Sequence, residues 1–188
     1  MNFSKTAIED IFLIEPSIYT DSRGYFAESF RLDKLEDFLG YTIDFCQENE
    51  SKSSRGVLRG LHYQAPPDAQ TKLVRVVSGS VLDVAVDIRI GSPTFGKHIS
   101  VELSSDNKLQ LLVPRGFAHG FVALEDETIL CYKVDNYYSS NNDCGILFND
   151  PLLGIDWRLD HNELCISEKD KAQPRLDKLQ DLFTYNSN

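Results

Sequence analysis

Two histidines in this chain stand beside glycines in short polar segments. His62 lies in Arg59-Gly60-Leu61-His62-Tyr63-Gln64, and His119 lies in residues 114–121, which read Pro-Arg-Gly-Phe-Ala-His-Gly-Phe. Imidazole changes its protonation near neutral pH, and glycine lets another backbone or a ligand approach closely. Both positions are therefore candidates for a pocket that performs general acid–base chemistry. The alternative for His62 is a core histidine whose hydrogen bonds are made within the protein. The residues around His62 leave both interpretations open.

Arg59 brings a cation close to the first histidine. If Leu58 and Leu61 anchor this segment as a strand, then Arg59 and His62 converge on one pocket. A guanidinium beside an imidazole suits a ligand that carries both an anion and an acidic proton. The segment thus predicts a site for an anionic ligand with a base next to it.

A metal site is a competing interpretation, because small cupin-type barrels often hold a metal through an H-x-H pair. His62 is followed by Tyr63 and Gln64, so that pair is absent from the segment. His98 and His161 have polar neighbours, which favour solvated side chains. We therefore expect no bound metal.

A series of short β segments is expected to position these histidines. Between residues 71 and 134, apolar runs alternate with turn signals such as Ser78-Gly79-Ser80 and Gly91-Ser92-Pro93. Short, evenly spaced strands are typical of a barrel or sandwich. The expected strands are Lys72–Val77, Ser80–Ile90, His98–Leu103, Leu109–Val113, Phe117–Leu124 and Thr128–Val134.

The other elements are expected to be few and peripheral. Within residues 81–88, Asp83 and Asp87 fall on one side, which suggests a strand buried on both faces that opens toward a polar interior. Apolar residues at helical spacing predict a short helix over Leu32–Leu39. Lys178–Phe183 suggests a terminal helix or a wrap against the barrel. We expect one domain over residues 1–188.

Composition excludes several classes of partner. The formal net charge of -10 disfavours nucleic acid and anionic membranes, because both are bound through basic patches. We find no apolar run of membrane-spanning length and no signal-peptide pattern, so we expect a cytoplasmic protein. No C-x-x-C spacing occurs, and reduced thiols are expected at the four cysteines, Cys46, Cys131, Cys144 and Cys165.

Four blocks occur in this order in the chain: Arg59 to Gln64, Lys72 to Val74, Val84 to Arg89 and Pro114 to Phe121. Together they resemble the dTDP-4-dehydrorhamnose 3,5-epimerase family. The similarity also extends from residues 21–28, through 149–151 and 155–157, to 167–170, and so covers nearly the whole chain. The resemblance implies a cupin-like antiparallel β-barrel, a jelly roll, with short peripheral helices.

This resemblance implies epimerisation at C3 and C5 of a nucleotide-linked 4-keto-6-deoxy sugar. The C4 carbonyl acidifies both positions by forming an enolate, so no redox cofactor is expected. By resemblance His62 is the base and Asp170 its orienting carboxylate. Tyr132 corresponds to the proton donor, and Lys72 lies near O4 to stabilise the oxyanion. The structural alternatives are an exposed loop acid for Asp170, an ordinary strand tyrosine for Tyr132 and a surface ion pair for Lys72.

The resemblance also implies a substrate-binding set and a homodimer. Arg59 and Arg23 look like diphosphate contacts, and Tyr138 is placed to stack on the base. An N-terminal strand of the family commonly crosses to a partner subunit, so Arg23 and Glu28 are expected to act in the neighbour's site. The remaining positions that match nucleotide or sugar contacts are Gln47, Asn49, His119, Asp143 and Lys169.

Two departures from the family pattern bear on the nucleotide. The family often has Glu at the position of Asp143, and often an aromatic residue where this chain has Lys97-His98. The alternatives are an epimerase acting at C3 or C5 alone, a 3,4-ketoisomerase, a sugar-nucleotide-binding cupin without activity, and a metal-dependent cupin oxygenase. The presence of base, acid and orienting carboxylate favours an enzyme over a binding protein.

Overall fold

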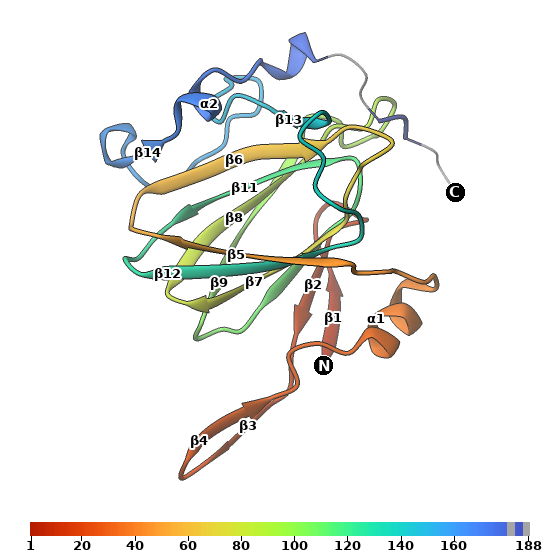
Figure 1. The fold of residues 1–188 in the computed structure, drawn as a ribbon, viewed down its shortest axis with the longest axis vertical. Helices are drawn as coiled ribbons and strands as arrows, with labels where there is room; N and C mark the ends of the chain where they lie inside the picture. The colour runs from red at the N-terminus through yellow and green to blue at the C-terminus, as the bar shows by residue number, and fades with distance from the viewer. Residues whose placement is uncertain (180–182, 186–188) are drawn as a thin grey trace.

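Two antiparallel sheets face each other in the computed structural model, which describes residues 1–179 and 183–185 (Figure 1). The first sheet has the strand order β1-β2-β10-β7-β12-β5. In that order, its strands span Asn2–Lys5, Phe12–Glu15, Gln110–Val113, Lys72–Ser78, Thr128–Val134 and Gln47–Ser53.

The second sheet has the order β13-β6-β11-β8-β9, and β14 adds to β6 in parallel. In that order, its strands span Asp143–Gly145, Val57–Gln64, Phe117–Ala123, Ser80–Asp87, His98–Ser104 and, for β14, Cys165–Ile166. The all-β architecture predicted from the sequence is confirmed.

Alternation along β8 explains how the second sheet is buried on both faces. Val81 and Ala85 pack into the core between the sheets. Leu82, Val84 and Val86 point the other way, into a second core on the outer face. Burying an aliphatic side chain of this size contributes about 1.5–3 kcal/mol, so both cores hold this strand in place. The expected two-sided burial of the strand is confirmed.

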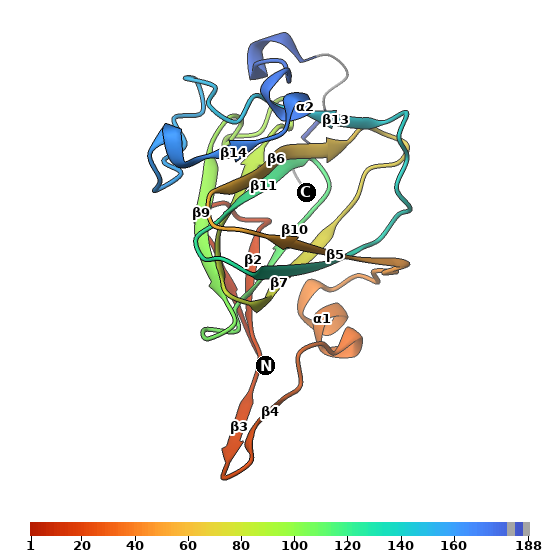
Figure 2. The same cartoon turned by 60° about the vertical axis from the view of Figure 1, so that its left-hand side comes forward.

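The chain that follows β13 covers the outer face of the second sheet. Ile146, Phe148 and Trp157 are buried against this face, and the covering segment carries β14 and α2 (Glu168–Lys171). In Figures 1 and 2 it lies over β6 and β11. This wrap brings residues 165–170 beside the strand that carries His62.

The helix predicted over Leu32–Leu39 forms with those bounds as α1. Its buried Leu35 packs with Ile14, Leu73 and Leu112 on the outer face of the first sheet. Gly40 ends the helix with φ 76°, a left-handed conformation that glycine adopts without strain. The expectation of a short peripheral helix is confirmed.

A hairpin of β3 (Ile18–Asp21) and β4 (Gly24–Ala27) projects from the body of the molecule (Figures 1 and 2). It pairs only within itself among the described strands. Its large apolar side chains are exposed, with Tyr19 at 63% and Phe26 at 67%. A hairpin this apolar is unusual for a surface that faces only water.

Two expected elements differ from the structure. The strand expected to reach Ile90 ends at Asp87, because the buried Asp87 carboxylate accepts hydrogen bonds from Arg89, Ser92 and Thr94 and organises a turn instead. The terminal element expected over Lys178–Phe183 includes residues 180–182, which lie outside the described residues. Its first residue ends the 3₁₀ helix Leu176–Lys178; the other 3₁₀ helix spans His161–Glu163. None of the described helices is long and apolar enough to cross a membrane.

Candidate active site

The two histidine-bearing strands approach each other unusually closely at a pair of glycines. A Cβ on Gly60, whose φ is +137°, would lie 2.5 Å from the Cα of Gly120. The register shifts at this point of the β6–β11 pair, and His62 lies directly opposite His119. The close backbone approach predicted at Gly60 is confirmed, and it brings both histidines to one place.

His62 is paired with a buried carboxylate from the far end of the chain. Its Nε2 lies 2.6 Å from Oδ1 of Asp170. The Asp170 side chain is only 5% exposed, whereas His62 is 31% exposed. Burial alone would raise the pKa of Asp170, but its hydrogen bonds with His62 and the Gly60 amide bring that pKa below its usual range. The alternative of Asp170 as an exposed loop acid is therefore wrong.

A short helix presents this carboxylate. Ser167 is the N-cap residue of α2, and its Oγ accepts a hydrogen bond of 3.1 Å from the Asp170 amide. The spacing Ser-x-x-Asp is a helix-start signal, so the sequence itself contains a cue to this turn. The cap fixes Asp170 at the end of β14, next to β6.

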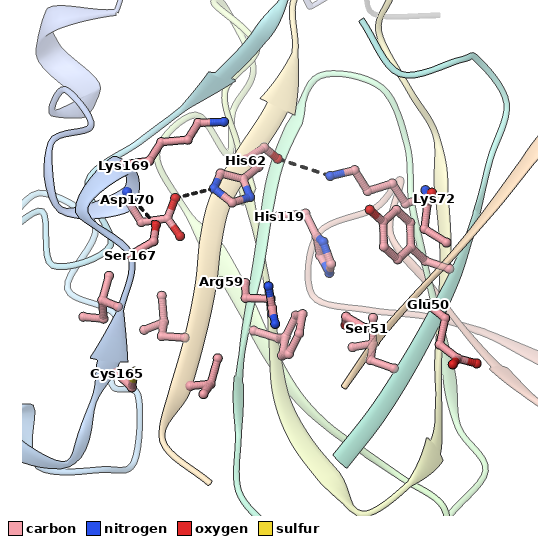
Figure 3. A pocket seen from close by; sticks show the side chains of 17 residues that line it. Glu50, Ser51, Arg59, His62, Lys72, His119, Cys165, Ser167, Lys169 and Asp170 are labelled. Carbon is pink, nitrogen blue, oxygen red and sulfur yellow. Dashed lines mark hydrogen bonds and ion pairs between the residues drawn. The ribbon is translucent and has the colours of Figure 1, made fainter. Parts of the chain in front are cut away.

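A cavity of about 540 Å³ opens beside the pair, and its walls come from both sheets and from the C-terminal wrap (Figure 3). Eight of the predicted site residues line it: Asn49, Arg59, His62, Lys72, His119, Tyr132, Lys169 and Asp170. Other lining residues were not predicted from the sequence, among them Glu50, Ser51, Phe121, Cys165 and Ser167.

Lys72 reaches into the cavity from the first sheet. Its Nζ donates a hydrogen bond of 3.3 Å to the backbone carbonyl of His62, so Lys72 and Asp170 approach His62 from opposite sides (Figure 3). Burial lowers the pKa of Lys72 to about 8, although the charges of Asp83 and Asp143 act in the opposite direction. The alternative of a surface ion pair is wrong, because Nζ bonds to a backbone carbonyl and the side chain lines the cavity.

Tyr132 faces the cavity from β12, on the sheet opposite His62. Burial raises the pKa of its hydroxyl, and a hydrogen bond with Asn49 partly offsets this effect. Asn49 is the direct register partner of Tyr132 on β5. The hydroxyl is therefore protonated at neutral pH.

His119 forms a second histidine–carboxylate pair, in the wall of the cavity. Its Nε2 lies 2.9 and 3.0 Å from the two carboxylate oxygens of Asp83. Both side chains are buried, with His119 at 7% and Asp83 at 0% exposure. The sequence placed Asp83 on an inward face but gave no sign of its partner, because the pairing depends on the β8–β11 register.

The remaining predicted residues of the body, Gln47, Tyr138 and Asp143, do not line the cavity but connect to residues that do. Lys169 donates to Asp143 at 2.5 Å, and the Tyr138 hydroxyl donates to the same carboxylate oxygen at 3.0 Å. Gln47 donates to Asn49 at 2.8 Å and accepts from the Tyr138 amide. These contacts form a connected polar rim at one end of the cavity.

Arg59 lines the cavity from β6, the strand that also carries His62. Its guanidinium makes two long contacts, with Ser53 Oγ at 3.3 Å and the Lys52 carbonyl at 3.4 Å. Neither contact neutralises its charge, so Arg59 offers a cation to an anionic ligand.

Arg23 and Glu28 lie away from this cavity. Arg23 is at the turn of the projecting hairpin and pairs with Asp21 at 2.5 Å. Glu28 follows the hairpin and pairs with Lys34 at 2.9 Å. Their position on an extended arm is compatible with action in another subunit, and that role stays a prediction.

The side chains around the cavity define a class of protein. Within the described part of the chain, no group of three or more His, Cys, Asp and Glu side chains is arranged to hold a metal ion. The cavity instead brings together a carboxylate-bound imidazole, a buried phenol and a lysine. Such groups suit proton transfer at a carbon next to a carbonyl, which is the chemistry of a cupin-like isomerase.

Comparisons with known proteins identify the family. The sequence model of dTDP-4-dehydrorhamnose 3,5-epimerase matches residues 5–178. The chain is 50% identical over 179 residues to the dTDP-4-dehydrorhamnose 3,5-epimerase of Escherichia coli K12, covering 95% of this chain and 96% of that relative. The chain belongs to the dTDP-4-dehydrorhamnose 3,5-epimerase family and is an enzyme of the isomerase class.

Solved structures support the same assignment. A dTDP-6-deoxy-D-glucose-3,5-epimerase from Legionella pneumophila, in complex with dTDP-4-keto-L-rhamnose, has a TM-score of 0.95 and 46% identity and covers 99% of both chains. A 3'-monoepimerase from Streptomyces bikiniensis, in complex with dTDP-quinovose, has a TM-score of 0.90 and 35% identity and covers 96% of this chain and 92% of that one. The cupin-like fold predicted from the sequence is confirmed.

Proposed function

We propose that this enzyme inverts C3 and C5 of dTDP-4-dehydro-6-deoxy-D-glucose to give dTDP-4-dehydro-L-rhamnose, with His62 as base and Tyr132 as acid. The observation that carries the proposal is the His62–Asp170 pair, at 2.6 Å, in a cavity whose opposite wall contains Tyr132. The Legionella relative, in complex with dTDP-4-keto-L-rhamnose, supports this substrate class.

The first step removes a proton from the carbon beside the keto group. Asp170 engages Nε2 of His62, and Nδ1 has no hydrogen-bond partner within residues 1–179 and 183–185, so Nδ1 takes the proton. The electron pair left on carbon delocalises onto the C4 oxygen, which becomes an enolate. Asp170 stabilises the imidazolium that forms, and a positioned base of this kind contributes roughly 10²–10⁴ in rate.

The second step returns a proton to the opposite face of the sugar. Tyr132 donates its hydroxyl proton to the carbon, and the C4 carbonyl re-forms. Solvent exchange then removes the proton from His62 and restores the one on Tyr132, so no oxidant or reductant is needed. The Lys72 ammonium stabilises the enolate oxygen, which is worth about 10²–10³ in rate for one well-aimed donor.

The nucleotide is placed by the groups around the reacting centre. Arg59 binds the diphosphate, since its guanidinium is not neutralised by a carboxylate in its two protein contacts. Tyr138 stacks on the base, while Asp143 and Lys169 contact the nucleotide from the rim. His119, Gln47 and Asn49 contact the sugar or nucleotide.

Proton NMR of the keto sugar nucleotide in D₂O tests this proposal. Wild-type enzyme should incorporate deuterium at both C3 and C5, and the coupling constants of the product should report inversion at both. His62→Ala should incorporate none. Exchange at both carbons by the variant would rule out His62 as the base.

A single-site epimerase is the second candidate, because the chain also resembles a solved 3'-monoepimerase along almost its whole length. The same groups would then act at C3 alone. Deuterium at one carbon only, with one inverted centre, would identify this activity.

We also propose that the chain is one domain that acts as a homodimer, with the β3–β4 hairpin of each copy reaching the neighbour's site. The exposed apolar hairpin supports this assembly, because Tyr19, Tyr25 and Phe26 are each at least 60% exposed. Arg23 and Glu28 would thereby join the partner's substrate contacts. A cytoplasmic location and independence from metals and cofactors stay predictions from the sequence.

A further inference from the structure

The loop between β12 and β13, residues 135–142, carries Tyr138, which is 58% exposed. These eight residues form no helix or strand. An exposed aromatic side chain on an irregular loop is ordinarily mobile, and a mobile ring loses entropy when a ligand stacks on it. A stacking role for Tyr138 therefore requires other groups to hold the loop in place.

The side chain of Gln64, the last residue of β6, holds the backbone on both sides of Tyr138. Its Nε2 donates a hydrogen bond of 3.2 Å to the Tyr137 carbonyl, and its Oε1 accepts one of 2.6 Å from the Ser139 amide. One side-chain amide thus binds both peptide groups that flank Tyr138, much as a neighbouring strand would. Nε2 also donates to the Asp68 carbonyl at 2.7 Å, which fixes the amide itself.

Gln64 lies behind the loop and outside the catalytic cavity. It is only 5% exposed, and both polar atoms of its side chain are hydrogen-bonded. It does not line the cavity that contains His62. Gln64 therefore acts on a ligand through the loop that it holds.

Other hydrogen bonds hold the loop at other points. The Tyr138 amide donates to Gln47 at 3.1 Å, and its hydroxyl donates to Asp143 at 3.0 Å. Further back in the loop, Gln70 Nε2 donates to the Asn136 carbonyl at 2.8 Å. Gln70 is thus a glutamine that binds the same loop away from the peptide groups next to Tyr138, and it provides a matched control.

We propose that Gln64 positions Tyr138 for the nucleotide base, so that the stacking surface exists before the ligand binds. This inference rests on the proposed function, in which Tyr138 stacks on the base. A ring that is already in place loses less conformational entropy on binding, and this raises the affinity. Gln64 is thereby a positioning residue for nucleotide recognition and leaves proton transfer at His62 and Tyr132 unchanged.

Calorimetric titration with dTDP tests this role without requiring turnover. The proteins are wild type, Gln64→Leu, Tyr138→Ala, the double variant and the control Gln70→Leu. Leucine has a volume similar to that of glutamine and makes no hydrogen bonds with its side chain. We expect Gln64→Leu to weaken dTDP binding about 5- to 30-fold, which is within the contribution of one base–aromatic stack. Gln70→Leu should bind within about twofold of wild type.

The double variant separates an effect through Tyr138 from any other effect. If Gln64 acts by holding that ring, Gln64→Leu should cause less than about a twofold further loss in the Tyr138→Ala background. Additive losses would show that Gln64 acts elsewhere and would overturn the proposal. An unchanged affinity of Gln64→Leu would also overturn it, as would an equal loss in Gln70→Leu, because the whole loop would then have loosened.

Turnover distinguishes this role from a structural effect on His62, which is two residues away on the same strand. At saturating substrate, deuterium exchange by Gln64→Leu should stay within about threefold of wild type, while KM rises in step with the lost affinity. A large fall in the saturated rate would overturn the proposal. If Gln64→Leu does not fold, Gln64→Glu gives the same test, because it keeps the acceptor for Ser139 and loses the donor to Tyr137.

The wild-type enzyme shows whether a failure belongs to this inference or to the proposed function. If it neither binds dTDP nor exchanges deuterium, both proposals fail. If it binds dTDP without exchange, the proposed chemistry fails, and the titrations still decide the role of Gln64. If it does both and Gln64→Leu is unaltered, only this inference fails.

Discussion

Both carboxylate oxygens of Asp170 contact β6, the strand that carries His62. Oδ1 lies 2.6 Å from His62 Nε2, and Oδ2 accepts a hydrogen bond of 3.4 Å from the Gly60 amide. The two residues are 108 positions apart. The Gly60 amide of β6 thus orients the carboxylate, and the carboxylate in turn orients the His62 imidazole on the same strand.

Asp170→Asn should reduce turnover by about 10²–10⁴, because an amide cannot stabilise the imidazolium that forms when His62 takes a proton. Steady-state turnover followed by proton NMR measures this. Glu168→Gln is the matched control, since Glu168 is an exposed acid on the same short helix and pairs only with Lys171 in the described contacts. A fall of less than tenfold in Asp170→Asn would contradict the orienting role.

Lys72 should impose an alkaline limit on the reaction. Burial lowers its pKa to about 8, so the ammonium is lost as pH rises through about 8 and the enolate loses its cation. Turnover should fall above that pH in wild type, whereas Lys72→Arg, which stays charged, should keep its activity to higher pH. A pH–rate profile of the two proteins measures this, and coincident alkaline limbs would exclude Lys72 as their cause.

The same shift has a consequence for stability with the opposite sign. The folded-state pKa of Lys72 lies below the ordinary value of 10.5. Between about pH 8 and 10.5 the unfolded chain therefore binds more protons than the folded one, and this group's contribution to stability rises with pH. Denaturant unfolding across that window should show the free energy of unfolding of wild type rising with pH relative to that of Lys72→Met.

Local signals in the sequence predicted the central strands and α1, because alternation, turn residues and helical spacing act over short ranges. The two histidine segments were also predicted to line a pocket, because histidines beside glycines in polar segments are unusual in a packed core. The Asp83–His119 pair was not, because it depends on strand register. The end of β8 at Asp87 was missed for a related reason: side-chain hydrogen bonds to its carboxylate replaced a strand that apolar content favoured.

The placement of Asp170 could not be deduced from spacing or composition. It requires the C-terminal segment to cross the outer face of the second sheet, and that path is set by the burial of residues such as Trp157 and Leu176. Only the family resemblance linked Asp170 to His62 beforehand.

Gly60→Ala should destabilise the fold strongly. The new Cβ would lie 2.5 Å from the Gly120 Cα, and the φ of +137° disfavours any side chain. We expect a loss of about 3 kcal/mol or more in the free energy of unfolding, measured by denaturant titration. Gly91→Ala is the control, because its φ is also positive but no atom lies within 4 Å of the added Cβ; it should lose about 1 kcal/mol.

Changes on the hairpin should alter assembly and leave the fold of each subunit intact. Tyr25 and Phe26 are 60% and 67% exposed, so replacing both with Glu removes apolar surface without opening a core. We expect the double variant to be monomeric by light scattering while wild type is dimeric, with an unchanged circular dichroism spectrum. A wild-type monomer, or a variant that remains dimeric, would exclude the hairpin as the contact.

Tyr132→Phe should separate proton removal from inversion. His62 and Asp170 remain intact, so the base can still take a proton from carbon, exchange it with D₂O and return deuterium to the same face. Without the phenol on the opposite sheet, the other face receives no proton from the enzyme. NMR should then show deuterium incorporated with the original stereochemistry and inverted product reduced by at least about 10². Inversion at the wild-type rate would show that another group supplies the proton, and loss of both exchange and inversion would indicate that Tyr132 is also needed to form the enolate.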